Sequence, residues 1–463
     1  MKKATSILLL LALVATLACT LVACNPADEE WYVEEGAEVI NVYLRDFEEW
    51  SNNYTIDAIR RFNSNLTDGI QVEYTLLLAD QYENKVQSDR EAGKAPDVYL
   101  ISYGNLLTAI NYNYILPLEN VLSQKMIDDI SESAKNYVYL KEHLYAAPFC
   151  FEPSIMLFYS KKAFAAAGVT SAPKTYAEML DACAKIKPTL SKAQYVVGTP
   201  KGLPMGWANI GQFYNAAGGN LPVSDDWSES LVMQNKEGYT SFLNYYTSLY
   251  TKGYTPLQDC AGGYNEIIRE VCEGRAAMTF AGSYAVSTIY DEYPECVDDI
   301  EVAVVPTMDG TSNVATTTNG GWSYVLDAAT AKRKGADGRT HAELAAKFLE
   351  FLLTDSEVAP EYFEKANYCK SAGYNSVIAA TAKEGESNKY YAEIARAASN
   401  AIATPLYNYD ITTECSKMIE EMVINGKSAD QVITTFDNMV KQIIRQSGLA
   451  GNNPAYVLSL ERY

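Results

Sequence analysis

Three stretches decide the fold: residues 38–45 read EVINVYLR, residues 70–78 read IQVEYTLLL and residues 93–102 read GKAPDVYLIS. Each is rich in apolar and β-branched residues, which favours a strand. Between the first two, NYTIDAIRRFNSN (53–65) places Ile56, Ile59 and Phe62 on one helical face. Residues 81–91 indicate a second helix. The alternation of strand and helix predicts an open, mostly parallel α/β sheet.

The middle of the chain continues in the same way. Residues 144–164, LYAAPFCFEPSIMLFYSKKAF, are apolar enough for a strand buried on both faces. Thr175 and Glu178 form a T-x-x-E pattern, which predicts a capping box at the start of the next helix. Residues 300–306 and 320–326 indicate further strands, and HAELAAKFLEFLLTD (341–355) indicates a helix.

The N-terminus has the features of an export signal. Lys2 and Lys3 precede an apolar run that ends in LVAC at residues 21–24. Ordinary secretory cleavage is one interpretation. The other is a lipobox, in which the thiol of Cys24 is alkylated by lipid and becomes the first residue of the mature chain. We therefore predict a leader over 1–23 and an acidic tether over 24–37.

Composition limits the classes of partner. The chain has 37 Lys and Arg against 58 Asp and Glu, a net charge of −21. A chain this acidic should not bind nucleic acid or an anionic membrane surface by charge. Membrane contact should therefore come from the lipid alone. The 463 residues allow two or three domains.

Patterns of catalysis and metal binding are absent from the sequence. It contains no G-x-S-x-G elbow, H-E-x-x-H motif or Walker loop, and only two histidines, His143 and His341, the second of which we expect at the surface. We therefore expect no enzyme, no metal and no cofactor. A disulfide among Cys260, Cys272 and Cys296 is left open.

Aromatic residues carry the one positive signal for a site. There are 35 Tyr and 5 Trp against 13 Phe, and four of these rings lie in expected loops at strand ends: Tyr103, Trp207, Tyr284 and Trp322. Open α/β sheets bind ligands at the carboxyl ends of their strands. A flat ring packs against the apolar face of a sugar, and Arg45, Asp46 and Glu152 could then bind its hydroxyl groups.

Several segments together resemble the extracellular solute-binding proteins of bacterial ABC importers, in the carbohydrate-binding branch that includes maltose-binding protein. The resemblance spans nearly the whole mature chain, and its carriers are GKAPDVYLIS, ILPLENVL, LYAAPFCFE, PKTYAEML, CEGRAAMTFAGSY, VAVVPTMDG, GGWSYVL and AAKFLEFLLTD. It implies a two-lobed periplasmic-binding-protein-like fold (type II) with a ligand cleft between hinge-linked lobes.

The resemblance also implies an arrangement of the chain. Crossings between lobes are expected near Pro148–Glu152, Met278–Ala281 and Thr354. Lobe one would hold 38–148 and 281–353, lobe two 152–278 and 354–446, and a tail 447–463. Glu152 would reach the ligand, Tyr284 would follow the second hinge, and Trp207 and Tyr407 complete the expected ligand-binding set.

The function implied is non-catalytic capture of a mono- or oligosaccharide by a lipid-anchored monomer at the outer face of the cell membrane, with permease subunits as partners. The anchor suggests the surface of a Gram-positive cell. Three alternatives stay open: another solute on the same fold, such as a glycerophosphodiester or a peptide, a surface enzyme acting on glycans, and an adhesion lipoprotein.

Overall fold

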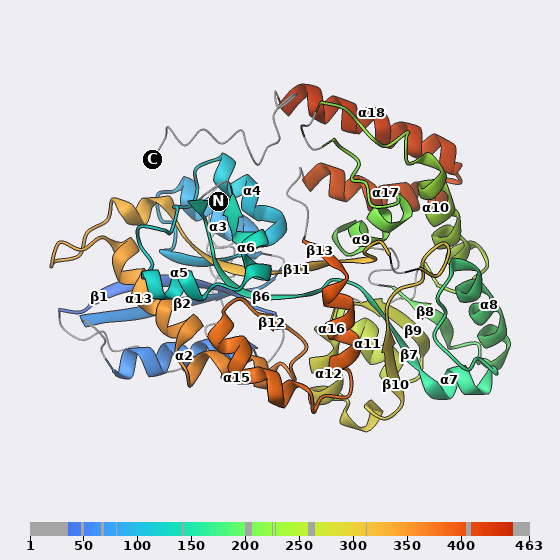
Figure 1. The fold of residues 1–463 in the computed structure, drawn as a ribbon, viewed down its shortest axis with the longest axis horizontal. Helices are drawn as coiled ribbons and strands as arrows, with labels where there is room; N and C mark the ends of the chain where they lie inside the picture. The colour runs from blue at the N-terminus through green and yellow to red at the C-terminus, as the bar shows by residue number, and fades with distance from the viewer. Residues whose placement is uncertain are drawn as a thin grey trace, which may run out of the picture.

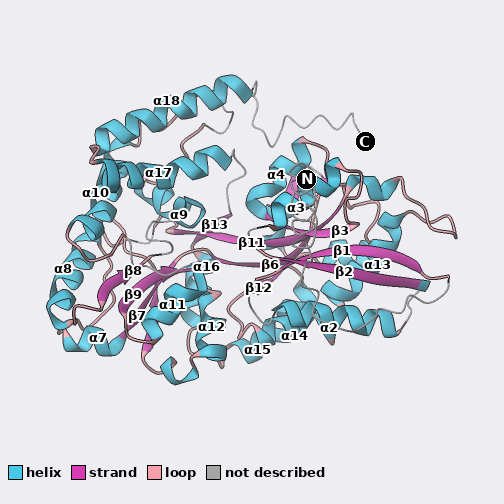
Figure 2. Ribbon diagram, turned by 180° about the vertical axis from the view of Figure 1, so that it is seen from behind, coloured by secondary structure: helices cyan, strands magenta, loops and turns pink. Residues whose placement is uncertain are grey.

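The computed structural model describes residues 36–47, 51–65, 69–79, 81–140, 143–199, 206–224, 226, 228–257, 264–311, 313–403 and 409–447. They form two α/β lobes, each built around its own sheet and covered by helices (Figure 1). Figure 2 shows the two sheets end to end, with strands β6 and β11 running from one toward the other. Among these residues, no helix combines the length and apolar character needed to cross a membrane.

The first lobe contains a seven-stranded sheet in the order β12-β6-β11-β3-β1-β2, with β13 also paired to β11. β1 is parallel to β2 and β3, as the sequence predicts, whereas β11 is antiparallel to β3 and β6. The strands are β1 (Glu38–Arg45), β2 (Ile70–Leu77), β3 (Val98–Ser102), β6 (Ala147–Pro153), β11 (Thr317–Leu326), β12 (Ser371–Ala372) and β13 (Ala401–Ala403).

Buried and more exposed side chains alternate along β1, so one face of the strand packs in the core of this lobe. Ile40, Val42 and Leu44 are buried, while the residues between them face outward or toward helices. The helices of this lobe are α2 (Ser51–Ser64), α3 (Tyr82–Glu91), α4 (Tyr103–Asn111), α5 (Gln124–Asp129), α6 (Glu132–Val138), α13 (His341–Thr354), α14 (Val358–Lys365) and α15 (Asn375–Gly385). A two-stranded sheet, β4 (Tyr139–Leu140) and β5 (His143–Leu144), completes it.

The second lobe contains a four-stranded sheet in the order β10-β7-β9-β8. Its strands are β7 (Met156–Ser160), β8 (Tyr195–Gly198), β9 (Ala276–Ala281) and β10 (Ile300–Ala303). Its helices are α7 (Lys161–Ala166), α8 (Tyr176–Ile186), α9 (Gly206–Ala216), α10 (Lys236–Thr251), α11 (Tyr264–Cys272), α12 (Ala285–Glu292), α16 (Tyr391–Ser399), α17 (Tyr409–Asn425) and α18 (Ala429–Ser447).

The capping box predicted at the start of α8 is confirmed. The Thr175 hydroxyl accepts the Glu178 N–H at 3.0 Å, and the Glu178 carboxylate accepts the Thr175 N–H at 3.3 Å. These two bonds satisfy backbone donors that the first helical turn leaves without partners.

Two of the predicted lobe crossings are wrong. Residues 285–305 belong to the second lobe, because β10 pairs with β7 and the apolar side of α12 packs in the second-lobe core. The chain returns to the first lobe along β11, not near Met278–Ala281, since β9 lies inside the second sheet. After Thr354, α14 and α15 still pack on the first lobe. The resemblance that implied these crossings rests on short sequence segments, which do not show which sheet a strand joins.

The described cysteines are free thiols, so the disulfide left open by the sequence is not formed between Cys272 and Cys296. The two lie close together, because the Cys296 thiol donates to the Cys272 carbonyl oxygen at 3.1 Å. Cys260 and Cys24 lie outside the described residues.

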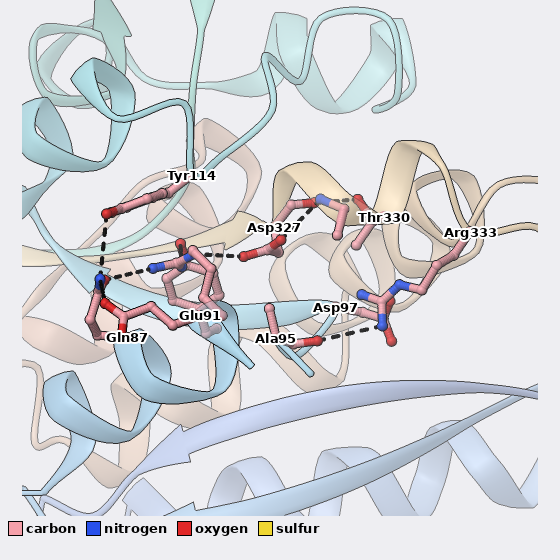
Figure 3. Close-up of polar contacts among 11 residues, drawn as sticks. Gln87, Glu91, Ala95, Asp97, Tyr114, Asp327, Thr330 and Arg333 are labelled. Atoms are coloured by element: carbon pink, nitrogen blue, oxygen red, sulfur yellow. Dashed lines mark hydrogen bonds and ion pairs between the residues drawn. The ribbon is translucent and has the colours of Figure 1, made fainter. Parts of the chain in front are cut away.

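A largely buried polar network lies at the end of the first-lobe sheet where β3 begins (Figure 3). The Asp97 side chain is fully buried and lies 2.7 Å from the Arg333 guanidinium and 3.0 Å from the ring of His341. Nearby, Asp327 pairs with Arg90 at 3.1 Å. His341 is therefore part of this network and not the surface residue that the sequence suggested.

Candidate ligand-binding site

The two sheets are connected by a hydrogen-bonded junction. After β6, the Ser154 N–H donates to the Thr318 carbonyl oxygen at 2.8 Å, and the Thr318 hydroxyl donates to the Ser154 hydroxyl at 2.9 Å. The Ile155 N–H donates to the Thr317 hydroxyl at 3.1 Å. These residues are buried. Where the chain passes from one sheet to the other, the hydrogen bonds given above therefore satisfy buried polar groups.

Arg45 and Trp322 meet at the carboxyl end of β1. The Arg45 guanidinium lies 5.0 Å from the centre of the Trp322 ring and 4.7 Å from the centre of the Phe47 ring. The two rings contact each other edge to face at 5.1 Å. The cation over a ring face is an attractive contact that fixes both side chains. Two residues predicted from sequence are thus brought together, and Phe47, which was missed, joins them.

Asp46 is positioned by its backbone. Its N–H donates to the Leu77 carbonyl oxygen at 2.7 Å, which holds the exit of β1 against the end of β2. The side chain is half-buried beside the Arg45, Phe47 and Trp322 cluster.

Two polar residues that sequence reasoning missed lie at the same sheet edge. Glu83 is in the first turn of α3 and Asn105 is in the first turn of α4, which follows β3 directly. The Asn105 amide donates to Glu83 Oε1 at 3.3 Å. Desolvation by the surrounding protein raises the pKa of Glu83, and the charge of Arg45 acts in the opposite direction. Nothing in the helical pattern of 81–91 distinguishes Glu83 from a surface acid.

Tyr103 is a correction to the sequence-based site. It begins α4 and does not lie in a loop, only 1% of its surface is exposed, and its ring packs 4.7 Å from that of Tyr137. A Cβ at Gly321 would approach Tyr103 Cε2 to 2.7 Å, so the ring also packs closely against β11. Burial raises the pKa of its hydroxyl. Tyr103 therefore packs beneath the surface next to Gly321 and presents no ring face to a ligand.

Glu152 and Tyr284 lie farther along the junction. Glu152 is half-buried in β6, opposite Gly320 of β11. Tyr284 follows β9 on the second lobe, and its ring folds back over Gly282, where a Cβ would lie 2.6 Å from Tyr284 Cε1. The ring is half-buried against the second-lobe core. Part of it is thus a core contact, as well as a candidate ligand surface.

Two further predicted rings are Trp207 and Tyr407. Trp207 is the second residue of α9, but its side chain lies outside the described part of the structure, as does the whole of Tyr407.

A small cavity lies beneath the Arg45 guanidinium. Its volume of about 10 Å³ is enough for one water and too small for a sugar ring. It is lined by Leu44, Arg45, Phe47, Thr55, Leu100, Phe149, Tyr324 and Tyr362. Among the residues that the structure describes, no group of three or more His, Cys, Asp or Glu side chains could hold a metal ion.

Solved structures share this fold. A solute-binding protein from Thermotoga lettingae, bound with α-D-tagatose, aligns with a TM-score of 0.72 at 20% identity over 88% of this chain and 100% of its own. The GacH receptor of Streptomyces glaucescens, solved without ligand and with acarbose, aligns with a TM-score of 0.72 at 15% identity over 88% of this chain and 99% of its own. UgpB from Mycobacterium tuberculosis, in complex with glycerophosphocholine, aligns with a TM-score of 0.69 at 16% identity over 89% of this chain and 100% of its own.

Residues 57–393 match the family model described as bacterial extracellular solute-binding protein. This span includes the second-lobe sheet, the junction and the first-lobe strands β2, β3, β6, β11 and β12, whereas β1 and β13 lie outside it. The chain belongs to the family of bacterial extracellular solute-binding proteins.

Proposed function

We propose that this protein captures a carbohydrate outside the cell and delivers it, chemically unchanged, to an ABC importer. The observation that carries the proposal is the Arg45, Phe47 and Trp322 cluster at the carboxyl edge of the first sheet. Aromatic rings beside charged hydrogen-bonding groups fit a ligand with apolar ring faces and many hydroxyl groups. Relatives of the same fold bound with tagatose and acarbose support this choice.

Within this proposal each residue has a role. Trp322 offers its ring to the apolar face of a sugar, and Arg45, Asp46 and Glu152 bind hydroxyl groups. Tyr284 contacts the ligand from the second lobe, and Trp207 and Tyr407 are further candidate contacts whose side chains lie outside the described part of the structure. Tyr103 has no direct role because its ring is buried.

A thermal-shift screen against mono- and oligosaccharides tests the proposal. A sugar that binds only the folded state should stabilise it by about 2.7 kcal/mol at 100 times its dissociation constant. Mass spectrometry after incubation should recover the sugar unmodified, which separates a binding protein from a glycan-active enzyme. A panel that produces no shift, or a sugar that is cleaved, would contradict the proposal.

Another solute on the same fold is the second candidate. The UgpB complex with glycerophosphocholine shows that this fold also accepts a phosphodiester. A phosphate would favour several cations at the site, and the first-lobe edge contributes mainly Arg45 among its described residues. A peptide ligand belongs to the same screen. An adhesion lipoprotein or a surface enzyme has less support, because the family is one of solute-binding proteins.

The proposal includes a lipid anchor at Cys24, which would hold a monomer at the outer face of the membrane, near its permease partners, on a Gram-positive cell surface. Its support is the LVAC sequence after the apolar run. We expect Cys24→Ala to move the protein from the membrane fraction to the medium or to block its processing. Cys183→Ala, at a buried thiol, is a control that should stay in the membrane fraction. A Cys24→Ala variant that is processed like the wild type and still fractionates with the membrane would place the anchor elsewhere.

A further inference from the structure

Glu83 is held at the ligand edge of the first lobe by its neighbours in the chain. The preceding residue, Tyr82, is buried under the sheet, where its hydroxyl donates to the Leu100 carbonyl oxygen at 3.0 Å and accepts the Leu100 N–H at 2.8 Å. The same hydroxyl lies 3.3 Å from the Tyr43 carbonyl oxygen. The first turn of α3 is therefore fixed over the carboxyl halves of β1 and β3.

Glu83 lies within hydrogen-bond distance of Asn105 and feels the charge of Arg45. Its side chain is exposed to solvent, yet desolvation is the largest influence on its carboxyl group and raises the pKa. Figure 1 shows α4, which carries Asn105, on the side of the first lobe that faces α9 and α17.

One carboxylate oxygen of Glu83 remains for a ligand. Oε1 accepts the Asn105 amide at 3.3 Å, and Oε2 has no partner among the described residues. An acid in the first turn also suits the helix dipole, which is the ordinary structural role for such a residue. Interaction with the helix dipole does not require the hydrogen bond between Glu83 and Asn105 of α4, nor the proximity of Glu83 to Arg45.

We propose that Glu83 sets the charge selectivity of the site: its carboxylate accepts hydrogen bonds from the hydroxyl groups of a neutral sugar and repels anionic ligands such as uronic acids and sugar phosphates. The carboxylates of Asp46 and Glu152 also repel anions, whereas the guanidinium of Arg45 attracts them. This inference rests on the proposed carbohydrate function and adds the class of carbohydrate.

The experiment compares the full mature protein with Glu83→Gln by calorimetric titration. The neutral probes are D-glucose, D-tagatose and maltotriose, and the charged probes are D-glucuronate, glucose 6-phosphate and glycerophosphocholine. Glu91→Gln, an equivalent change at the exposed far end of α3, is the matched control. Glu83→Gln should weaken binding of the preferred neutral sugar about ten-fold, since a hydrogen bond to a charged group is lost. It should also narrow the gap between neutral and anionic probes, whereas Glu91→Gln should change neither.

The outcomes separate this inference from the proposed function. If the wild type binds a neutral sugar and Glu83→Gln binds it with the same affinity and the same discrimination against anions, Glu83 is only a first-turn acid and the inference is overturned. If the wild type binds an anionic probe as tightly as a neutral sugar, the inference is likewise overturned while solute capture stands. Binding of no sugar at all would overturn the proposed function and the inference with it.

Discussion

At the scale of single residues, Trp322 is the ring on which the proposed site depends. It is half-buried, with Arg45 over its face and Phe47 at its edge, so it is neither a core residue nor a loose surface ring. Tyr324, two residues along β11, is fully buried. One strand therefore carries a candidate ligand ring and a core ring, and the two can be compared directly.

We expect Trp322→Ala to weaken sugar binding by about 1–3 kcal/mol, by analogy with the stacking of bases on aromatic side chains. It should cost less folding stability than Tyr324→Ala, for which removal of a buried ring predicts a loss of about 3–5 kcal/mol. Calorimetric titration and urea denaturation measure the two effects. Wild-type affinity in Trp322→Ala would show that the stacking surface lies elsewhere, with the side chains of Trp207 and Tyr407 as the next candidates.

Asp97 is the fully buried acid of the polar network in the first lobe. Besides Arg333 and His341 it accepts the Asn41 N–H at 2.9 Å, and it lies at the opposite end of β3 from Asn105. Asp97→Asn leaves Arg333 without its charge partner. Because Arg333 is 36% exposed, the loss should fall at the lower end of the about 3–5 kcal/mol typical of broken buried pairs. Chemical denaturation checks this.

Asp337→Asn is the control for that change, since Asp337 pairs with Arg339 at the surface and should contribute little. Sugar affinity should be unchanged in both variants. Equal stability of Asp97→Asn and the wild type would mean that the network contributes nothing to folding.

At the scale of elements, α9 lies directly on the junction between the sheets. A Cβ at Gly211 would lie 2.4 Å from Thr317 Cα, so only glycine lets the helix approach β11 so closely. We expect Gly211→Ala to force α9 away from β11. The resulting strain should cost about 1–3 kcal/mol, less the helical preference of alanine, which is roughly 1 kcal/mol.

Gly104→Ala in α4 is the matched control, because nothing lies within 4 Å of its Cβ position. It should be neutral or slightly stabilising in thermal unfolding. The contact between α9 and β11 would not be a tight one if Gly211→Ala were as stable as Gly104→Ala.

The elements also show what the sequence can predict. The apolar alternation of 38–45 gives β1, and the Thr175 and Glu178 pattern gives the start of α8, because both depend on neighbouring residues. The assignment of 285–305 to a lobe fails because pairing between β10 and β7 joins residues about 140 positions apart. Glu83 was missed for a similar reason: its partners Arg45 and Asn105 lie on other elements, and α3 alone carries a surface-like pattern.

At the scale of the whole molecule, the two lobes are joined at one side by more than the junction strands. Ala366 and Cys369, between α14 and β12, pack in the second-lobe core. The Ser287 hydroxyl donates to the Ala366 carbonyl oxygen at 2.9 Å, and the Ser283 hydroxyl donates to the Cys369 carbonyl oxygen at 2.5 Å. Relative movement of the lobes must therefore pivot near these contacts and near Ser154 and Thr318.

Ligand binding should close the lobes about this pivot. Trp322 and Glu83 belong to the first lobe and Tyr284 to the second, so a sugar that contacts all three gains most when the lobes approach. We expect small-angle scattering to show a smaller radius of gyration at saturating sugar than without it. Trp322→Ala at the same sugar concentration should stay closer to the unliganded radius, because it loses a first-lobe contact. A saturated protein whose radius is unchanged would mean that the ligand binds to a preformed site, and the pivot at Ser154 and Thr318 would then have no part in capture.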